Sequence, residues 1–220
     1  MSAVAPHDIK KLLILGTGTY ALDVADLIDD IPELEVVGFV ASLPPYTPGA
    51  TLLDLPVYWV DDLPNFAQTC WAVCALVTTK RHHFIEQATD LGMRFATVIH
   101  PSARVSRRAT IGEGTIINGG VQIATHTQLG KHVIVNRGAL IGHHNAIHDY
   151  ATISPGANLA GNVTIGARAY VGLGANILEK RTIGNQAVVA AGALVTKDVP
   201  NRTKVMGAPA RVVETEIDGL

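Results

Sequence analysis

The sequence has few aromatic residues, 5% of its 220 positions, and a formal net charge of only −2. A core must therefore be built from small and β-branched aliphatic residues. The charge balance offers no basic field for nucleic acid and no polybasic patch for a membrane surface. No apolar run is long enough to span a bilayer, and residues 1–11 lack the apolar stretch of a signal peptide, so the sequence predicts a cytoplasmic protein.

Cysteine is also scarce, since Cys70 and Cys74 are the only two in the chain and both lie in one apolar run. Such a pair inside a strand makes neither a disulfide framework nor a zinc site. We expect both thiols to be buried and reduced. Hydrophobic residues make up 48% of the chain and charged residues 16%, which is enough apolar surface for a folded core.

Before residue 98, strand-like and helix-like segments alternate. Apolar runs predict strands, and apolar residues at helical spacing predict helices. The predicted strands cover 11–16, 34–41, 70–79 and 95–100, and the predicted helices cover 19–31 and 81–93, with a proline-rich loop at 43–56. This alternation is typical of a small three-layer α/β unit with a parallel sheet.

After residue 98, an aliphatic residue recurs at every sixth position without a gap. The series is Ile99, Val105, Ile111, Ile117, Ile123, Leu129, Val135, Ile141, Ile147, Ile153, Leu159, Ile165, Val171, Ile177, Ile183, Val189 and Val195. A period of six fits a coil with three flat faces, in which each aliphatic side chain points into a narrow prism. Three hexads form one coil of eighteen residues, and stacked coils bury a continuous core.

Small residues precede most of these aliphatic residues by two positions, as Ala103, Thr115 and Ala139 do. Glycines recur at eighteen residues or twice that spacing, at positions 112, 130, 166 and 184. His148 stands where the same series would place another glycine. It belongs to the stretch IGHHNAIHDY (141–150), whose crowded histidines suit a catalytic base, a metal site or a polar surface.

The hexads, together with IHPSA (99–103), GANLAGNVTIG (156–166), VGLGANI (171–177) and KDVPNRTKVMGAPARVV (197–213), resemble the hexapeptide-repeat acyltransferases. Within that family the chain is similar to the amino-sugar N-acetyltransferases and sialic-acid O-acetyltransferases. The resemblance implies a Rossmann-like sugar-nucleotide-binding domain at 1–97 and a left-handed parallel β-helix at 98–200. A C-terminal tail at 201–220 would carry the Gly-Ala-Pro-Ala turn (207–210).

The resemblance assigns His143 as the general base that takes a proton from a sugar amine or hydroxyl during attack on acetyl-CoA. Imidazole suits this role because it exchanges protons near neutral pH, and a corner amide N–H would stabilise the developing oxyanion. The family places an acidic residue after this histidine, whereas this chain has His144. The alternatives for the missing acidic residue are Asp149 and a carboxylate from a neighbouring subunit. Asn145 replaces a small residue at a tight corner.

The same resemblance implies a homotrimer that binds acetyl-CoA in a groove between two subunits. Matched position by position, the contacting residues are Thr152, Gly161, Asn162, Leu173 and Ala191. For each glycine and alanine, simple packing at a corner is an equally available interpretation.

Residues Gly16, Thr17, Gly18 and Thr19 follow a predicted strand and open a predicted helix, which is a suitable context for binding the phosphates of a substrate. The third glycine of a dinucleotide fingerprint is absent, and the second strand ends in Ala41-Ser42 where relatives have Asp-Asp, so NAD is not predicted. Lys80 and Arg81 stand where relatives have a Gly-Asp-Asn segment. They are interpreted as phosphate contacts or as solvated charges.

The predicted function is acetyl transfer from acetyl-CoA to an amino or hydroxyl group of a nucleotide-linked sugar, feeding polysaccharide or other glycoconjugate biosynthesis. The alternatives are a different acyl acceptor and a catalytically inactive sugar-binding or scaffold protein. A further alternative is a metal enzyme similar to the gamma-class carbonic anhydrases, with ligands among His126, His143, His144 and His148. No metal and no nucleic-acid partner are predicted.

Overall fold

The computed structural model describes residues 9–220, and predictions about residues 1–8 lie outside this range. The chain forms two compact units. One comprises the chain up to Leu76 together with His83–Ala96, and the other comprises Val77–His82 and Thr97–Leu220. Within the described range, no helix has the length and apolar character needed to cross a membrane.

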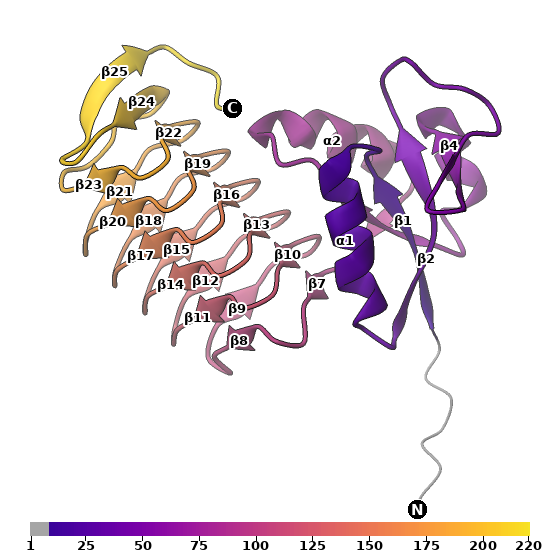
Figure 1. The fold of residues 1–220 in the computed structure, drawn as a ribbon, viewed down its shortest axis with the longest axis horizontal. Coiled ribbons are helices and arrows are strands. Elements are labelled where there is room, and N and C mark those ends of the chain that lie inside the picture. Colours follow the sequence, from indigo (N-terminus) through magenta and orange to yellow (C-terminus); the bar gives the residue numbers. More distant parts are fainter. Residues whose placement is uncertain (1–8) are drawn as a thin grey trace, which may run out of the picture. The chain divides into compact units, whose positions relative to one another are not determined.

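The first unit is an α/β sheet structure (Figure 1), with strand order β3-β4-β2-β1-β5-β6. Among the strands that the structure describes in this unit, only the β3–β4 pair is antiparallel. Residues 12–15 of β1 are fully buried, as expected for a central parallel strand. The elements are β1 (Lys10–Leu15), α1 (Thr19–Asp29), β2 (Leu34–Ala41), β3 (Thr51–Leu52), β4 (Leu55–Trp59), the 3₁₀ helix η1 (Val60–Asn65), β5 (Trp71–Cys74), α2 (His82–Asp90) and β6 (Arg94–Phe95).

The α/β class predicted for this half is confirmed, and β2 has the predicted bounds. Two local predictions are wrong. The segment 43–56, predicted as a loop, contains β3 and the start of β4, where Pro56 lies in an antiparallel pair at the sheet edge. An edge pair tolerates proline because few backbone N–H groups are needed there. The strand predicted at 70–79 ends at Cys74 as β5, and both cysteines are buried and form no disulfide.

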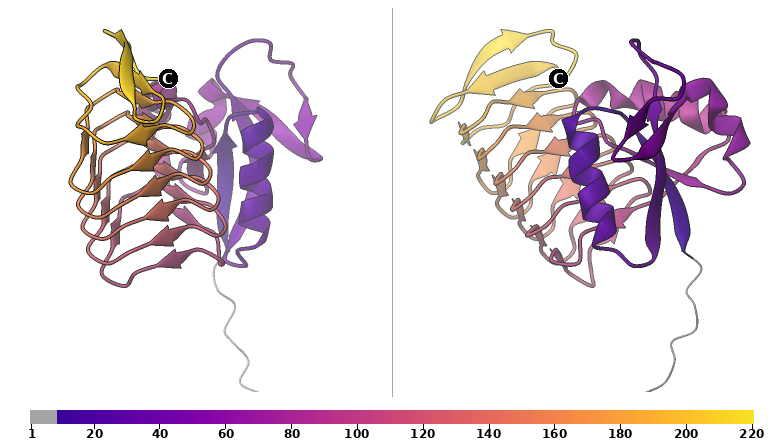
Figure 2. Two further views of the ribbon diagram at one scale, coloured as in Figure 1. Left: turned by 60° about the vertical axis from the view of Figure 1, so that its left-hand side comes forward. Right: turned by 45° about the vertical axis from the view of Figure 1, so that its right-hand side comes forward.

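The second unit is a left-handed parallel β-helix (Figure 2), as the resemblance implied. Each strand pairs with the strand eighteen residues away, so Ile117 of one coil pairs with Ile99 and Val135 of its neighbours. Three stacked sheets result. The first sheet contains β7 (Val98–Ile99), β10 (Ile116–Ile117), β13 (Ile134–Val135), β16 (Thr152–Ile153), β19 (Tyr170–Val171), β22 (Val188–Val189), β24 (Thr203–Met206) and β25 (Arg211–Thr215).

The other two sheets contain only strands of two residues. One is made of β8 (Arg104–Val105), β11 (Gln122–Ile123), β14 (Leu140–Ile141), β17 (Asn158–Leu159), β20 (Asn176–Ile177) and β23 (Leu194–Val195). The last is made of β9 (Thr110–Ile111), β12 (Gln128–Leu129), β15 (Ala146–Ile147), β18 (Thr164–Ile165) and β21 (Thr182–Ile183). The turn at 207–210 joins β24 to β25.

The predicted core series is buried from Ile117 to Val195. The first coil differs, because Ile99 is 37% exposed and Val105 and Ile111 are only partly buried. A first coil packs against one neighbouring coil instead of two, so its inward residues keep more contact with solvent. The recurrent glycines also have a clear cause: a Cβ on Gly166 would lie 2.6 Å from the backbone carbon of Gly184 one coil later.

Arg81 is a buried structural residue of the second unit, and both interpretations of it as a phosphate contact or a solvated charge are wrong. It closes the short 3₁₀ helix η2 (Thr79–Arg81) and is 1% exposed. Its Nη2 donates to the carbonyls of His132, Tyr150 and Ala151 at 2.8–2.9 Å. Its Nη1 donates to Thr152 Oγ1 at 2.8 Å and to Thr78 O at 2.9 Å. The guanidinium thus ties the segment 77–82 to two successive coils.

His132 lies beside this guanidinium, with its ring stacked on Tyr150 at 5.4 Å between centroids. Burial lowers the pKa of His132 to about 4, helped by Arg81 and Lys131 and opposed by Glu113 and Asp149. The folded state therefore binds this proton only well below the ordinary value of 6.5. Between pH 6.5 and 4 the unfolded chain binds more protons, so the free energy of unfolding falls as the pH falls.

We expect the stability lost through this group to reach about 3 kcal/mol at pH 4, from about 1.4 kcal/mol per unit of pKa difference. The His132→Asn variant should lose this part of the acid dependence, since asparagine accepts the positive φ of 54° found at this position. Denaturant unfolding between pH 7 and 4 measures it. The exposed His148→Asn variant is the control, and an unchanged slope in His132→Asn contradicts the assignment.

Candidate active site

His143 and His144 form a turn between β14 and β15, at one corner of the prism. The same corner carries Thr125-His126 one coil earlier and Gly161-Asn162 one coil later, and we call these six residues the His143 corner. The second residue of each pair has positive φ, at 58°, 56° and 59° in chain order. The backbone N–H of His144 donates to Thr125 O at 3.0 Å, and that of Asn162 donates to His143 O at 2.9 Å. The strict coil length therefore stacks these side chains in register.

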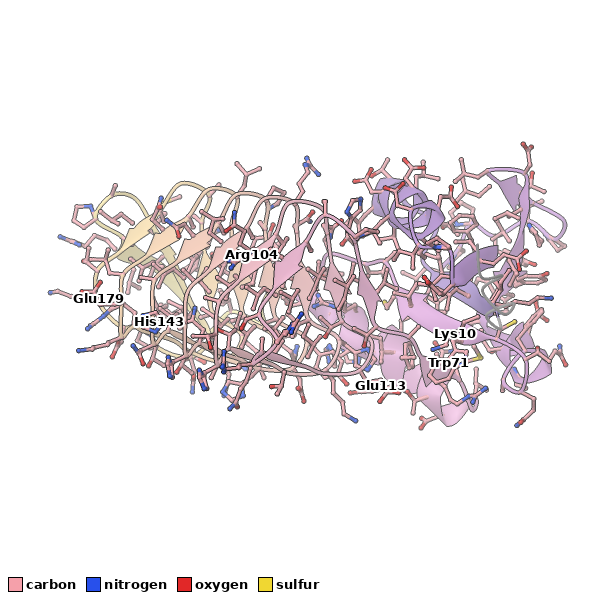
Figure 3. All side chains as sticks on the ribbon, turned by 90° about the horizontal axis from the view of Figure 1, so that it is seen from below. Lys10, Trp71, Arg104, Glu113, His143 and Glu179 are labelled. Atoms are coloured by element: carbon pink, nitrogen blue, oxygen red, sulfur yellow. The ribbon has the colours of Figure 1, made fainter. Side chains whose placement is uncertain are left out.

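The two histidine rings are in direct contact. His143 Nδ1 lies 3.1 Å from His144 Nδ1, with the rings nearly perpendicular at 84°. The His144 ring stacks on that of His126, at 4.8 Å between centroids and 10° between planes. Thr125 Oγ1 contacts His126 Nδ1 at 2.8 Å. All three histidines are exposed, and Figure 3 labels His143 among the side chains that project from the coils.

The His143 ring packs against Gly161, in space that a side chain at position 161 would fill. A Cβ at position 161 would lie 2.5 Å from Cε1 and 2.7 Å from Nε2 of His143. No side chain larger than hydrogen fits there without moving the ring. Within residues 9–220 the structure records no hydrogen-bond partner for the N–H of Gly161, the residue against which the His143 ring lies.

Asn145 follows the pair and points inward, in the series of small residues, with 1% exposure. Its Oδ1 accepts from the N–H of Val163 at 2.7 Å, and its own N–H donates to Thr127 Oγ1 at 3.4 Å. Its buried Nδ2 has no hydrogen-bond partner within the described residues. Asn145 thus links the coil that carries His143 to the coils before and after it.

The fold and this corner were compared with known proteins. Neither models of protein families nor the curated sequences gave a match. Among solved structures, a mutant of perosamine N-acetyltransferase from Caulobacter crescentus, in complex with CoA and GDP-perosamine, is 30% identical. The match covers 94% of this chain and 98% of that one, with a TM-score of 0.86. The chain belongs to the hexapeptide-repeat sugar acetyltransferases.

Two further members of the family are similar over almost their whole length. The acetyltransferase domain of PglB from Neisseria gonorrhoeae, in complex with acetyl coenzyme A, is 30% identical, with 93% of this chain and 99% of that one covered and a TM-score of 0.85. WeeI from Acinetobacter baumannii is 26% identical, with 93% and 100% covered and a TM-score of 0.84.

As a sugar acetyltransferase, this chain departs from the family pattern at His144, and the structure does not bring Asp149 to the pair. Asp149 lies at the next corner, beyond β15, and its Oδ1 accepts from the backbone N–H of Lys131 at 2.8 Å. The structure records no contact between Asp149 and His143 or His144. Within one chain, Asp149 is therefore a corner residue that holds the preceding coil.

The residues matched to acetyl-CoA contacts in this acetyltransferase lie in three places. Gly161 and Asn162 belong to the His143 corner. Leu173, which is 57% exposed, and the exposed Ala191 lie at another corner. Thr152 is 1% exposed, accepts from Arg81 and donates to Val77 O at 3.2 Å. Its hydroxyl is thus engaged inside the unit, and its contact with acetyl-CoA stays an untested prediction.

The loop Gly16–Thr19, predicted from the sequence to bind the substrate, follows a strand and opens a helix as expected. Gly16 follows β1 with φ at 122°, and a Cβ there would lie 3.2 Å from Ala75 O. Gly18 is the N-cap of α1 and provides no side-chain cap. The amides at Thr19 and beyond therefore open a helix next to exposed Thr17, an arrangement that favours anions.

The alternative of a metal enzyme lacks support in the part of the chain that the structure describes. There, no three side chains of histidine, cysteine, aspartate or glutamate are grouped as metal ligands. His126 and His144 stack face to face, which directs their nitrogens side by side and not at a shared point.

The Gly161→Ala variant tests how the His143 ring is seated. The new methyl group must displace the ring, and we expect the turnover to fall at least tenfold, by analogy with other misplaced catalytic groups. Thermal stability and acetyl transfer are measured together. Gly119→Ala is the control, because Gly119 lacks the positive φ that disfavours alanine and the nearest atom to a Cβ there is Ser102 Oγ at 3.3 Å. Equal activity in both variants contradicts the seating role.

Proposed function

We propose that this chain is an acetyl-CoA-dependent N-acetyltransferase that acts on the amino group of a nucleotide-linked sugar. The membership of the family supports the acyl transfer. Its similarity to an enzyme solved with CoA and GDP-perosamine, and to a domain solved with acetyl coenzyme A, supports the two substrates. The observation that carries the proposal is the position of the His143 ring. Its Nε2 lies 2.7 Å from the place that a Cβ on Gly161 would occupy, and the N–H of Gly161 has no recorded partner among the described residues.

In the proposed reaction, His143 is the general base. The sugar amine attacks the thioester carbon of acetyl-CoA, and its proton passes to His143 Nε2. The C–N bond forms, the C–S bond breaks, and the proton then passes to the sulfur of CoA. The reaction needs no covalent enzyme intermediate. The Caulobacter enzyme has also been solved with one histidine replaced by asparagine or by alanine, in complex with CoA and GDP-perosamine.

The Gly161 N–H is the proposed donor to the thioester oxygen. Negative charge develops on that oxygen as the amine attacks, and a fixed backbone N–H stabilises it without reorganisation. Because Gly161 also seats the His143 ring, one residue sets the distance between base and oxyanion donor. Asn162, at the same corner, is proposed to contact acetyl-CoA beside it.

We propose that the active form is a cytoplasmic homotrimer, with one acetyl-CoA between two subunits. The reason lies in the placement of the predicted contacts. Gly161 and Asn162 occupy the His143 corner, whereas Leu173 and Ala191 occupy a corner on the far side of β14, β17 and β20. One ligand contacts both groups only if two chains contribute one corner each. The exposed Leu173 is then covered in the assembly.

The loop Gly16–Thr19 is proposed to bind the phosphates of the nucleotide. The position after β2 carries Ala41-Ser42 in place of the acidic pair expected from relatives, so base recognition differs from theirs. A thiol-release assay with acetyl-CoA tests the function against GDP-, UDP- and dTDP-linked amino sugars and their hydroxyl analogues. Release with an amino sugar alone supports N-acetylation. Release with a hydroxyl analogue alone makes the enzyme an O-acetyltransferase, and no release with any acceptor refutes the proposal.

A further inference from the structure

The His143 corner holds a second imidazole where an acidic helper is expected, and this rests on the proposed function of His143 as a base. We propose that His144, held in place by its stack on His126, is a neutral positioning residue. Its Nδ1 accepts a hydrogen bond from Nδ1–H of His143 and thereby leaves His143 Nε2 unprotonated for the sugar amine.

The geometry requires a single shared proton. Two ring nitrogens 3.1 Å apart form one N–H···N hydrogen bond, so one donates and the other accepts. If His143 donates, its proton is on Nδ1 and its Nε2 carries the lone pair. If His144 donates, neutral His143 carries its proton on Nε2 and is unable to act as a base there. The direction of this one bond therefore decides whether the site is active.

The stack on His126 holds His144 in register. The planes of the two rings differ by 10°. Thr125 Oγ1 contacts His126 Nδ1 at 2.8 Å, so the His126 ring is itself held by Thr125. His144 and His126 share a positive-φ backbone conformation, at 56° and 58°, so their side chains leave equivalent positions in adjacent coils. His126 and His144 are spaced by one coil, which makes the pair a product of the repeat.

No carboxylate replaces His144 in the surroundings that the structure describes. The titratable groups in recorded contact with His144 are His126 and His143. The same corner of the following coil carries Gly161 and Asn162, which are uncharged. Asp149 is bonded to Lys131 at another corner. Within one chain, the partner of His143 is therefore neutral when the site is active.

A neutral imidazole partner has a consequence that a carboxylate lacks. A protonated His144 has hydrogen on both nitrogens and only donates, so it forces the inactive direction on the shared bond. A proton on either ring therefore removes the free lone pair of His143 Nε2. Activity is expected to fall more steeply toward low pH than in a variant whose acceptor does not titrate.

Three substitutions at position 144 separate acceptor from donor. Gln186, Glu216 and Lys180 already adopt positive φ in this chain, at 58°, 58° and 60°, so glutamine, glutamate and lysine are compatible with the corner backbone. His144→Gln and His144→Glu keep an acceptor, whereas His144→Lys has only donors. We expect turnover in His144→Lys to fall about 10- to 100-fold, with KM for both substrates within about threefold of wild type. His144→Glu should equal or exceed wild type, and His144→Gln should lie within about fivefold. His148→Gln is the control histidine.

The pH profile excludes a merely structural role. The ratio of kcat/KM in His144→Gln to that in wild type should rise at least about twofold as the pH falls from 8 to 5.5, because only wild type has a second histidine to protonate. A ratio that stays constant over this range overturns the proposal, as does full activity in His144→Lys.

A measurement without substrate keeps this inference distinct from the proposed function. In protein labelled with ¹⁵N-histidine, the nitrogen shifts of His143 report which nitrogen carries the proton. We expect His143 to be protonated on Nδ1 and unprotonated on Nε2 in wild type and in His144→Glu. In His144→Lys we expect a mixture of both His143 tautomers. This result upholds the positioning role even if no tested sugar is acetylated. Protonated Nε2 in wild type overturns it even if the acetyltransferase assay succeeds.

Discussion

Replacement of His143 by alanine is expected to lower the turnover of acetyl transfer by about 10²- to 10⁴-fold, the range typical of a lost general base. The side chain is exposed and packs against the bare face of Gly161, so its loss removes a reacting group without opening a cavity in the core. The KM for acetyl-CoA should change by less than about threefold. Thiol release under saturating nucleotide sugar measures both parameters.

Two controls make this result specific. The exposed His148→Ala variant removes a histidine from the same coil at a different corner and should keep wild-type turnover. The molecular mass in solution should remain that of wild type in both variants. Near-normal turnover in His143→Ala contradicts its role as the base. A loss accompanied by dissociation of the assembly, with acetyl-CoA binding also lost, would assign His143 to the interface instead.

The β-helix could be predicted from the sequence because one local rule repeats without interruption. An inward aliphatic residue such as Ile117 meets its equivalents eighteen residues away, and a single core satisfies all of them. The rule fails at Ile99, which obeys the period but lies in a coil with only one neighbour. Periodicity specifies the direction of a side chain, whereas burial also depends on what covers it.

The candidate site was predictable where it follows from the coil length. His126 and His144 are eighteen residues apart, which brings their rings into one stack. The contact of Asp149 was not predictable, because its nearness to His144 in the sequence does not specify which corner its carboxylate contacts. Only the structure shows that it accepts from Lys131. Nor does the sequence indicate that the shared proton of the pair depends on a neutral neighbour.

Arg81 marks the largest gap between sequence and structure. The residues around it are polar and begin a helix, which is a usual pattern for a solvated surface. Its partners His132, Tyr150 and Thr152 lie 51 to 71 residues further along the chain, so no local pattern indicates burial. A buried arginine is recognised only by the carbonyl groups that converge on it, and these come from corners of two different coils.

The Arg81→Met variant is therefore expected to be strongly destabilised, although methionine nearly matches the length of the arginine stem. The guanidinium donates to the carbonyls of His132, Tyr150 and Ala151, of which Ala151 O also accepts from the N–H of Ile134 at 3.0 Å. A buried acceptor left without a donor destabilises the fold by about 1–3 kcal/mol. Not all of these terms add, since water enters part of the space. We expect the free energy of unfolding to fall by about 3–5 kcal/mol, measured by denaturant unfolding.

The neighbouring Lys80→Met variant is the matched control, because Lys80 is exposed and its change should alter the free energy of unfolding by less than about 0.5 kcal/mol. Arg81→Lys should lie between wild type and Arg81→Met, since an ammonium supplies fewer donors and lacks the planar fork that reaches several carbonyls at once. Equal stability of Arg81→Met and Lys80→Met would mean that the segment 77–82 is held to the coils by other contacts, such as the bond from Thr152 to Val77. An ordered loss through lysine to methionine would instead identify the guanidinium as the group that holds this segment to the β-helix.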